Sequence, residues 1–146
     1  MRTLKISTKG IYGLKALVDL AIYSKEDIVT LKSISERQNI SERYLEQIFS
    51  LLRKSKIIVG KKGSQGGYSL DVNPEDTTMY TVLKALEGDF LQMSSVESDD
   101  KLDKVLEELV WNKLDESITN FLCSVTLQDL IDEYKKDEKD PFMYYI

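Results

Sequence analysis

A glycine-rich segment that directly follows a helical pattern constrains the fold of this chain more than any other feature. The segment VGKKGSQGGYSL, residues 59–70, places Gly63, Gly66 and Gly67 between two short stretches of β-branched and aromatic residues. Glycine takes positive φ angles without steric cost, as a tight or bulged hairpin requires. Large apolar residues at helical spacing occupy residues 42–55, just before this segment. We therefore predict a helix that is followed at once by a β-hairpin.

Two more helices are predicted on the N-terminal side of this unit. Apolar residues recur at three- and four-residue spacing up to Tyr23 and indicate an amphipathic helix that Ser7 or Thr8 caps. Thr30 caps a short second helix, and Ser41 caps the third helix after a tight turn. Two short helices joined by a tight turn form a helix-turn-helix, and a hairpin directly after it is a wing. The N-terminal half therefore predicts a winged-helix domain.

The second half of the chain is predicted to be helical. A fourth helix ends at Gly88, a loop follows over residues 89–100, and a long helix extends from Lys101 to about Leu122. Thr126, with an acidic residue three positions later, caps a final helix. The expected fold class is mostly α with a small β-hairpin. Its expected parts are a winged helix-turn-helix domain over residues 1–88, a loop, long helix and short C-terminal helix over residues 89–134, and a C-terminal tail over residues 135–146.

The composition excludes several classes of function. The chain has no histidine, the commonest general base and metal ligand, and contains neither a P-loop nor a dinucleotide-binding fingerprint. We therefore predict that it is not an enzyme and holds no metal or other cofactor. Its single cysteine rules out an internal disulfide and fits a reducing, cytoplasmic compartment. No apolar run reaches the roughly 20 residues that span a bilayer, so no membrane partner is expected.

Charge is distributed unevenly along the chain and points to a polyanionic partner. Residues 1–70 contain 13 lysines and arginines against 6 acidic residues, although the whole chain has a net charge of −5. A basic front with an acidic remainder predicts that the front binds double-stranded DNA. Arg43 suits guanine or a phosphate, Glu46 a cytosine amino group and Gln47 an adenine. The candidate DNA-binding residues lie on the first helix, on the third helix and on the wing, and they are Lys5, Thr8, Lys9, Tyr12, Ser41, Arg43, Tyr44, Glu46, Gln47, Arg53, Lys61, Lys62, Ser64 and Gln65.

Three segments of the sequence resemble a known family. LKISTKGIYGLKAL, ISERYLEQIFSLLRKSKII and GSQGGYSL are similar to segments of the winged-helix transcription regulators that include CymR, IscR and NsrR. The resemblance covers most of the chain and implies a homodimer on a palindromic operator, with the long helix crossing to the partner subunit. A long helix that packs back on its own domain is the alternative. The residues expected at the dimer interface are Leu102, Val105, Leu106, Leu109, Trp111, Leu114, Ile118 and Phe121.

The chain departs from this family at two places. Many members have an arginine where this chain has Ile11, so one phosphate contact is expected to be missing. Iron–sulfur members carry three cysteines in the loop that corresponds to residues 89–100, and this loop has none. Because a cluster needs thiolates or comparably soft ligands, the chain resembles a member without a cluster. Cys123, its one cysteine, is expected to lie in the core, and a redox switch is the alternative.

The sequence ends in an apolar tail, FMYYI, which follows a charged linker and Pro141. Cysteine-metabolism repressors of the CymR type end similarly, and their corepressor is the enzyme cysteine synthase. The resemblance therefore implies a repressor of cysteine or sulfur metabolism genes, to which cysteine synthase binds through Met143, Tyr144, Tyr145 and Ile146. Two alternatives remain. One is a regulator controlled by a small metabolite or by oxidation of its cysteine, and the other is a winged-helix adaptor that binds protein.

Overall fold

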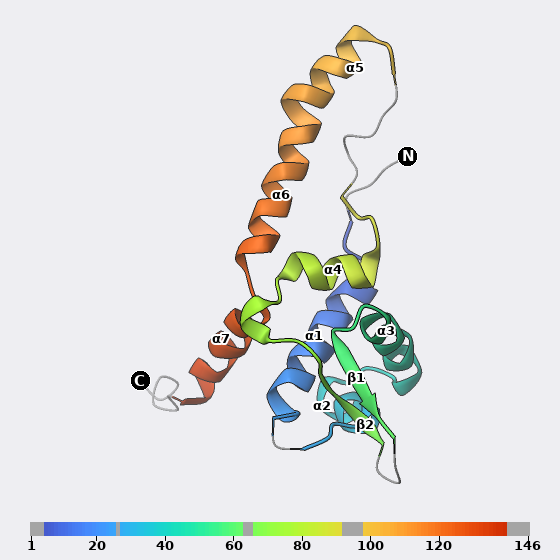
Figure 1. Cartoon of the computed structure of the whole chain (residues 1–146), viewed down its shortest axis with the longest axis vertical. Helices are drawn as coiled ribbons and strands as arrows, with labels where there is room; N and C mark the ends of the chain where they lie inside the picture. The colour runs from blue at the N-terminus through green and yellow to red at the C-terminus, as the bar shows by residue number, and fades with distance from the viewer. Residues whose placement is uncertain (1–4, 26, 63–65, 92–97, 140–146) are drawn as a thin grey trace.

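A body of packed helices carries a β-hairpin at one end and a long helix at the other in the computed structural model of the chain (Figure 1). The structure describes residues 5–25, 27–62, 66–91 and 98–139, with side chains up to Lys136. The elements are, in chain order, α1 (Thr8–Tyr23), α2 (Leu31–Gln38), α3 (Glu42–Lys54), β1 (Ile58–Lys61), β2 (Gly67–Leu70), the 3-10 turn η1 (Pro74–Asp76), α4 (Met79–Glu87), α5 (Lys101–Leu106), the π-helical turn η2 (Glu107–Trp111), α6 (Asn112–Ser124) and α7 (Leu127–Lys139).

The predicted fold class is confirmed, because three helices are followed by an antiparallel hairpin and then by further helices. In the hairpin, Lys61 of β1 lies opposite Gly67 of β2. Val29, which precedes α2, pairs with Tyr68 of β2 through two backbone hydrogen bonds of 2.8 and 3.2 Å. A Cβ added to Gly67 would lie 2.8 Å from the carbonyl oxygen of Val29, so glycine permits this close approach. The wing is thereby fastened to the start of α2.

Three helix starts agree with the sequence prediction. The side chains of Thr30 and Ser41 each accept a hydrogen bond of 3.1 Å from the backbone N–H three residues later, at the starts of α2 and α3. Thr126 and Asp129 exchange hydrogen bonds of 2.9 and 3.1 Å at the start of α7. These caps satisfy backbone donors that a helix start leaves without an intrahelical partner.

The start of α1 is capped differently from the prediction. Ser7 occupies the cap position, but its side chain accepts no hydrogen bond from the helix. Its hydroxyl donates to the Glu87 carboxylate at 2.6 Å, and the same oxygen accepts from the backbone N–H groups of Ser7 at 3.0 Å and Gly10 at 2.9 Å. A Cβ added to Gly10 would lie 2.5 Å from that oxygen, so glycine makes room for it. A carboxylate at the end of α4 therefore replaces the predicted cap.

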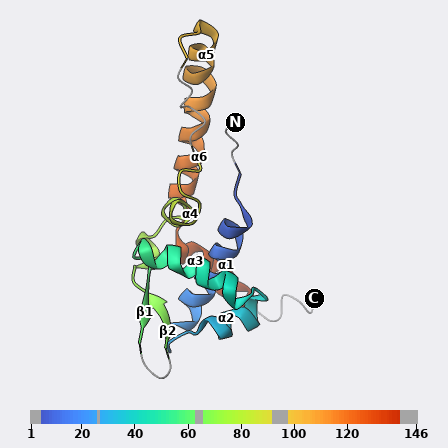
Figure 2. The same cartoon turned by 90° about the vertical axis from the view of Figure 1, so that its right-hand side faces the viewer.

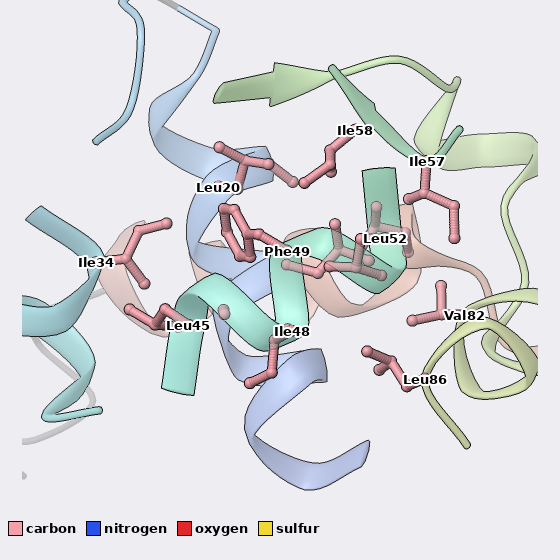
Figure 3. Close-up of a cluster of buried hydrophobic side chains, with 14 of the residues drawn as sticks. Leu20, Ile34, Leu45, Ile48, Phe49, Leu52, Ile57, Ile58, Val82 and Leu86 are labelled. Carbon is pink, nitrogen blue, oxygen red and sulfur yellow. The ribbon is translucent and has the colours of Figure 1, made fainter. Parts of the chain in front are cut away.

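The hydrophobic core lies between α1, α3 and α4 and beneath the hairpin (Figure 3). Phe49 of α3 is 1% exposed, and its ring meets the Tyr68 ring edge to face with the centroids 5.0 Å apart. Leu127 and Ile131 of α7 are fully buried in the same core. The last helix thus packs on the winged-helix body, although the long helix separates the two in sequence. The expected domain boundaries after residues 88 and 134 stay predictions.

A buried carboxylate joins α1 to α2. Asp19 is 2% exposed and accepts hydrogen bonds from Nε and Nη2 of Arg37 at 2.9 and 2.7 Å and from Nε2 of Gln38 at 2.8 Å. The Arg37 guanidinium also lies 4.0 Å from the centre of the Tyr23 ring. The hydrogen bond to Asp19 raises the pKa of Arg37 above its ordinary value. This clamp, which the sequence analysis did not anticipate, sets the position of α2 against α1.

Candidate nucleic-acid interface

Helix α3 buries one face and leaves the predicted DNA-reading residues on the outside. It lies across the body, with β1 and β2 beside its C-terminal end (Figure 2). Leu45, Ile48, Phe49 and Leu52 are buried. Because these positions recur at the helical period, the side chains between them point to solvent. The predicted residues of this segment that are exposed are Ser41, Arg43, Glu46, Gln47 and Arg53.

The starts of α1 and α3 lie against each other. The hydroxyls of Thr8 and Tyr44 are 3.3 Å apart, within hydrogen-bonding distance. The rings of Tyr12 and Tyr44 meet edge to face, with their centroids 5.9 Å apart. Three residues that were singled out separately in the sequence are thus neighbours on one surface. Tyr44 is half-buried, so it holds this surface together as well as contributing its hydroxyl to it.

The N-terminal end of α1 is not open to a phosphate. The Glu87 carboxylate already accepts hydrogen bonds from the backbone N–H groups of Ser7 and Gly10 there. An anion at a helix start normally uses those donors. Phosphate contacts at this place would therefore come from side chains. Lys5, Thr8, Lys9 and Tyr12 are all exposed there. Ile11, where many family members have an arginine, is exposed as well, at 50%.

A groove of about 420 Å³ lies between the wing and the helix-turn-helix. An ideal Cβ on Gly60 of β1 would lie 3.8 Å from an Arg53 guanidinium nitrogen, so the wing and the end of α3 are adjacent. Glu42 is an acidic residue on the groove's edge. Ser64 and Gln65, predicted at the wing tip, lie outside the described residues. The basic residues that line the groove are Lys32, Arg53, Lys61 and Lys62.

Lys32 is the basic residue of this groove that the sequence analysis missed. It is exposed near the start of α2, where no helical pattern distinguishes it from other surface lysines. The pairing of Val29 with Tyr68 is what brings that helix start against the wing. The arrangement therefore collects positive charge from three elements, α2, α3 and the wing, on one concave surface. Such a surface is suited to binding phosphate groups.

The long helix exposes most of the apolar residues that were predicted for a dimer interface. Its N-terminal part extends beyond the body, and α6 packs against α4 (Figure 1). Trp111, Leu114 and Ile118 are half-buried. Val110, at 41% exposure, belongs to the same apolar surface and was not predicted. The long helix therefore packs on its own domain only in part, through α6. The predicted residues that are exposed are Leu102, Val105, Leu106, Leu109 and Phe121.

The π-helical turn η2 interrupts this helix and changes the direction of its apolar face. The backbone N–H of Asn112 donates to the carbonyl oxygen of Glu107, five residues earlier. On an uninterrupted α-helix, Leu114 and Phe121 would point roughly 110° away from Leu102, since each residue turns the helix by about 100°. A turn with one extra residue removes about 100° of that difference. The apolar residues before and after η2 consequently share one face, which we call the α5–α6 face.

Cys123 does not lie in the core as expected. Its side chain is exposed near the end of α6. The neighbouring Leu122 is half-buried and packs on the core, so the helix turns Cys123 outward instead. By the helical period, Cys123 also points away from the α5–α6 face. The four tail residues Met143, Tyr144, Tyr145 and Ile146 lie outside the described residues.

Comparison with known proteins agrees with the expected family. Residues 6–133 match the Rrf2 family, described as an iron-dependent transcriptional regulator. The HTH-type transcriptional regulator CymR of Bacillus subtilis (strain 168) is 35% identical over 143 residues, which are 98% of this chain and 100% of that protein. Its solved structure, described as that of the global cysteine regulator, has a TM-score of 0.75 at 37% identity and covers 90% of this chain and 98% of that one. IscR of T. potens has a TM-score of 0.76 at 39% identity and covers 97% of this chain and 96% of that one.

These relatives are named as transcriptional regulators, which are not enzymes, and the prediction of a non-catalytic chain is confirmed on that ground. The word iron in the family's description does not fit the donor set of this chain. Iron–sulfur clusters are held by several cysteine thiolates, with histidine in some types, and the chain has one cysteine and no histidine. Within the described ranges, no three acidic or cysteine side chains gather as metal ligands. No helix in those ranges has the length and apolar character needed to cross a membrane.

Proposed function

Because the chain belongs to the Rrf2 family of transcriptional regulators, we propose that it represses genes of cysteine or sulfur metabolism as a homodimer on a palindromic operator. One observation carries the DNA-binding part of this proposal. The basic groove gathers Lys32, Arg53, Lys61 and Lys62 beside the exposed face of α3. A helix and a basic wing placed side by side can follow the major groove and the adjoining backbone.

In this proposal α3 reads base edges and the other residues position it. Arg43, Glu46 and Gln47 lie near the N-terminal end of α3, the end that enters the groove in helix-turn-helix proteins. Lys61 and Lys62 bind the backbone from the wing, and Lys5 and Lys9 do so from α1. The edge-to-face pair of Tyr12 and Tyr44 keeps α1 and α3 in one orientation while both contact DNA.

Replacing Lys61 and Lys62 together with alanine should weaken binding to operator and to unrelated DNA by similar factors. Each phosphate contact contributes about −0.9 to the slope of log K against log salt concentration, so the slope should become shallower by about 2. Fluorescence anisotropy over a series of salt concentrations measures this slope. The matched control is Lys135→Ala with Lys136→Ala on α7, which removes equal charge away from the groove and should leave the slope unchanged. A double wing variant with the wild-type slope would exclude the wing from the interface.

The homodimer is proposed from the α5–α6 face. A second copy of the chain is the partner that would cover it, because a two-fold axis places the same apolar residues opposite each other. Leu109 and Phe121 are 57% and 63% exposed, which is unusual for such large apolar side chains in a protein surface unless they form an interface. Two winged-helix bodies held by this helix would contact two half-sites, and the operator would therefore be palindromic.

The metabolic role is proposed from the tail and from a relative. CymR of Bacillus subtilis is described as a global cysteine regulator, and it aligns with this chain over its whole length. The tail of this chain carries Met143, Tyr144, Tyr145 and Ile146, whose apolar and aromatic side chains suit an apolar site on a partner protein. We propose that cysteine synthase binds this tail and acts as corepressor, and that O-acetylserine, the enzyme's substrate, displaces the tail when sulfur is scarce.

Genomic DNA selection with the purified protein tests the target genes. We expect palindromic fragments near sulfur-assimilation genes, enriched more strongly when cysteine synthase from the same cell is present. Specific fragments from unrelated genes would contradict the role in sulfur metabolism but would still support a DNA-binding regulator. If no specific fragment is selected with or without the enzyme, that result contradicts repression through DNA and favours the protein-binding adaptor.

Deleting residues 141–146 should abolish the binding of cysteine synthase and leave operator binding in the absence of the enzyme unchanged. The described helices do not include these residues, so the body is expected to retain its fold. Isothermal titration of the enzyme with the full chain and with the deleted chain measures the effect. Equal enzyme affinity of the full and deleted chains would exclude the tail as the binding element.

A further inference from the structure

A second groove, of about 330 Å³, opens between α1 and α7, away from the residues assigned to DNA. Its walls are mainly apolar, with Leu14, Val18 and Ile22 from α1 and Leu130 and Tyr134 from α7. Its volume lies at the lower end of the range of about 300–1,000 Å³ that is typical of ligand pockets. Leu127 and Ile131 of α7 are buried, whereas the next turn of that helix leaves part of the apolar stripe of α1 uncovered.

The segment best placed to fill this groove is the end of the same chain. Helix α7 forms one wall of the groove through Leu130 and Tyr134 and ends at Lys139, the residue that directly precedes the tail in sequence. Seven extended residues span at most about 25 Å. The distance back along α7 from Lys139 to Leu130 is about 14 Å, at 1.5 Å for each helical residue. The tail is therefore long enough to return along α7 as far as Leu130.

The chemistry of the groove also matches that of the tail. Five apolar or aromatic residues, FMYYI, suit its apolar walls. Asp19 lines the groove, but its buried carboxylate is paired with the positively charged guanidinium of Arg37. An apolar segment with aromatic side chains is thus the occupant that these walls select.

We propose that the groove between α1 and α7 binds the chain's own C-terminal residues 142–146. The docked tail covers Leu14, Val18 and Ile22 and is withheld from other proteins. A regulatory consequence rests on the proposed function: the groove and cysteine synthase compete for the same residues. Repression would then depend on how much enzyme is present to draw the tail out of the groove.

Photo-crosslinking in the full-length chain tests the proposal. A benzoylphenylalanine introduced in place of Tyr144 is irradiated, and mass spectrometry locates the residues it has reacted with. We expect crosslinks to residues 14–22 and 130–134 of the same chain, with light and heavy isotope-labelled copies mixed to separate crosslinks within a chain from those between chains. Crosslinks to other surfaces, crosslinks only between copies, or none at all would overturn docking in the groove.

A groove variant makes the test specific. Tyr134 is 48% exposed, so Tyr134→Ser should not disturb the fold. It removes one aromatic wall and should lower the crosslink yield by about fivefold, as truncating an aromatic contact does at interfaces. Tyr134→Phe keeps the wall and should keep the yield. Equal yields in all three proteins would show that the probe reacts without occupying the groove.

Adding cysteine synthase separates this inference from the proposed function. Crosslinks that disappear when the enzyme is added support both docking and competition. If the crosslinks persist and the enzyme does not bind, the corepressor hypothesis is overturned and docking of the tail in the groove still stands. Enzyme binding through the tail without any groove crosslink overturns docking and leaves the corepressor.

Discussion

Replacing Arg37 with methionine is expected to lower the free energy of unfolding by about 3 kcal/mol. The change removes two hydrogen bonds of 2.7 and 2.9 Å and leaves the carboxylate of Asp19, which is 2% exposed, with only its bond to Gln38. This loss lies at the lower end of the range expected when one partner of a buried ion pair is removed, because the Arg37 side chain is 31% exposed. A loss of this size is a large part of the free energy of unfolding of a typical domain, which is roughly 5–15 kcal/mol.

Chemical denaturation followed by circular dichroism measures this loss. Arg43→Met, an exposed arginine on α3, is the matched control and should change stability by less than about 0.5 kcal/mol. Replacing both partners, in Asp19→Leu with Arg37→Met, should restore much of the stability, because no charge is then buried without a partner. A double variant less stable than Arg37→Met alone would contradict this account.

The same pair predicts a particular pH dependence. Asp19 raises the pKa of Arg37, so the stabilisation from the Arg37 charge is fully present below the ordinary arginine pKa. It is lost only as the pH rises through the higher folded-state value. Loss of this clamp at mildly alkaline pH would therefore contradict the assigned partners.

The second large effect is expected at the α5–α6 face. Leu109→Glu with Phe121→Glu should convert the proposed homodimer to a monomer and lower operator affinity by about a hundredfold or more, because the two half-sites are then no longer bound by one linked molecule. Both side chains are more than half exposed in the protomer, so the winged-helix body should keep its stability. Light scattering coupled to size exclusion gives the oligomeric state, and anisotropy gives the affinity.

The matched control adds the same two charges to the helix outside the α5–α6 face. Asn112→Glu with Asn120→Glu alters two exposed residues there and should leave both the dimer and the operator affinity unchanged. Dimers of equal stability in both double variants would exclude the α5–α6 face as the interface.

A one-residue deletion tests the role of η2 in the same interface. Deleting Val110 removes the extra residue of the π-helical turn and should turn the residues before it by about 100° relative to α6. The dimer should weaken strongly although no charge is introduced. Deleting Asp99, in the loop before α5, shortens the chain equally without changing the helix and should leave the dimer intact. A stable dimer after the first deletion would show that η2 does not set the register.

Sequence patterns alone were sufficient for the features that depend on neighbouring residues. The caps at Thr30, Ser41 and Thr126 are hydrogen bonds between groups three residues apart, so the residue types at those positions specify them. The hairpin was predictable because glycines and β-branched residues specify a turn and two strands locally. The family resemblance rests on the same local motifs and was confirmed by comparison with solved structures.

Other features were decided only when distant segments packed together. The Glu87 carboxylate caps α1 from 80 residues away, and Asp19 pairs with Arg37 across two helices, because the core brings those elements together. Neither contact leaves a periodic signal in the sequence, since each involves a single residue on each side. The exposure of Cys123 and the convergence of Lys32 with the wing depend in the same way on packing of whole elements. Local chemistry therefore determined which helices and strands form, and tertiary packing determined which of their polar residues meet.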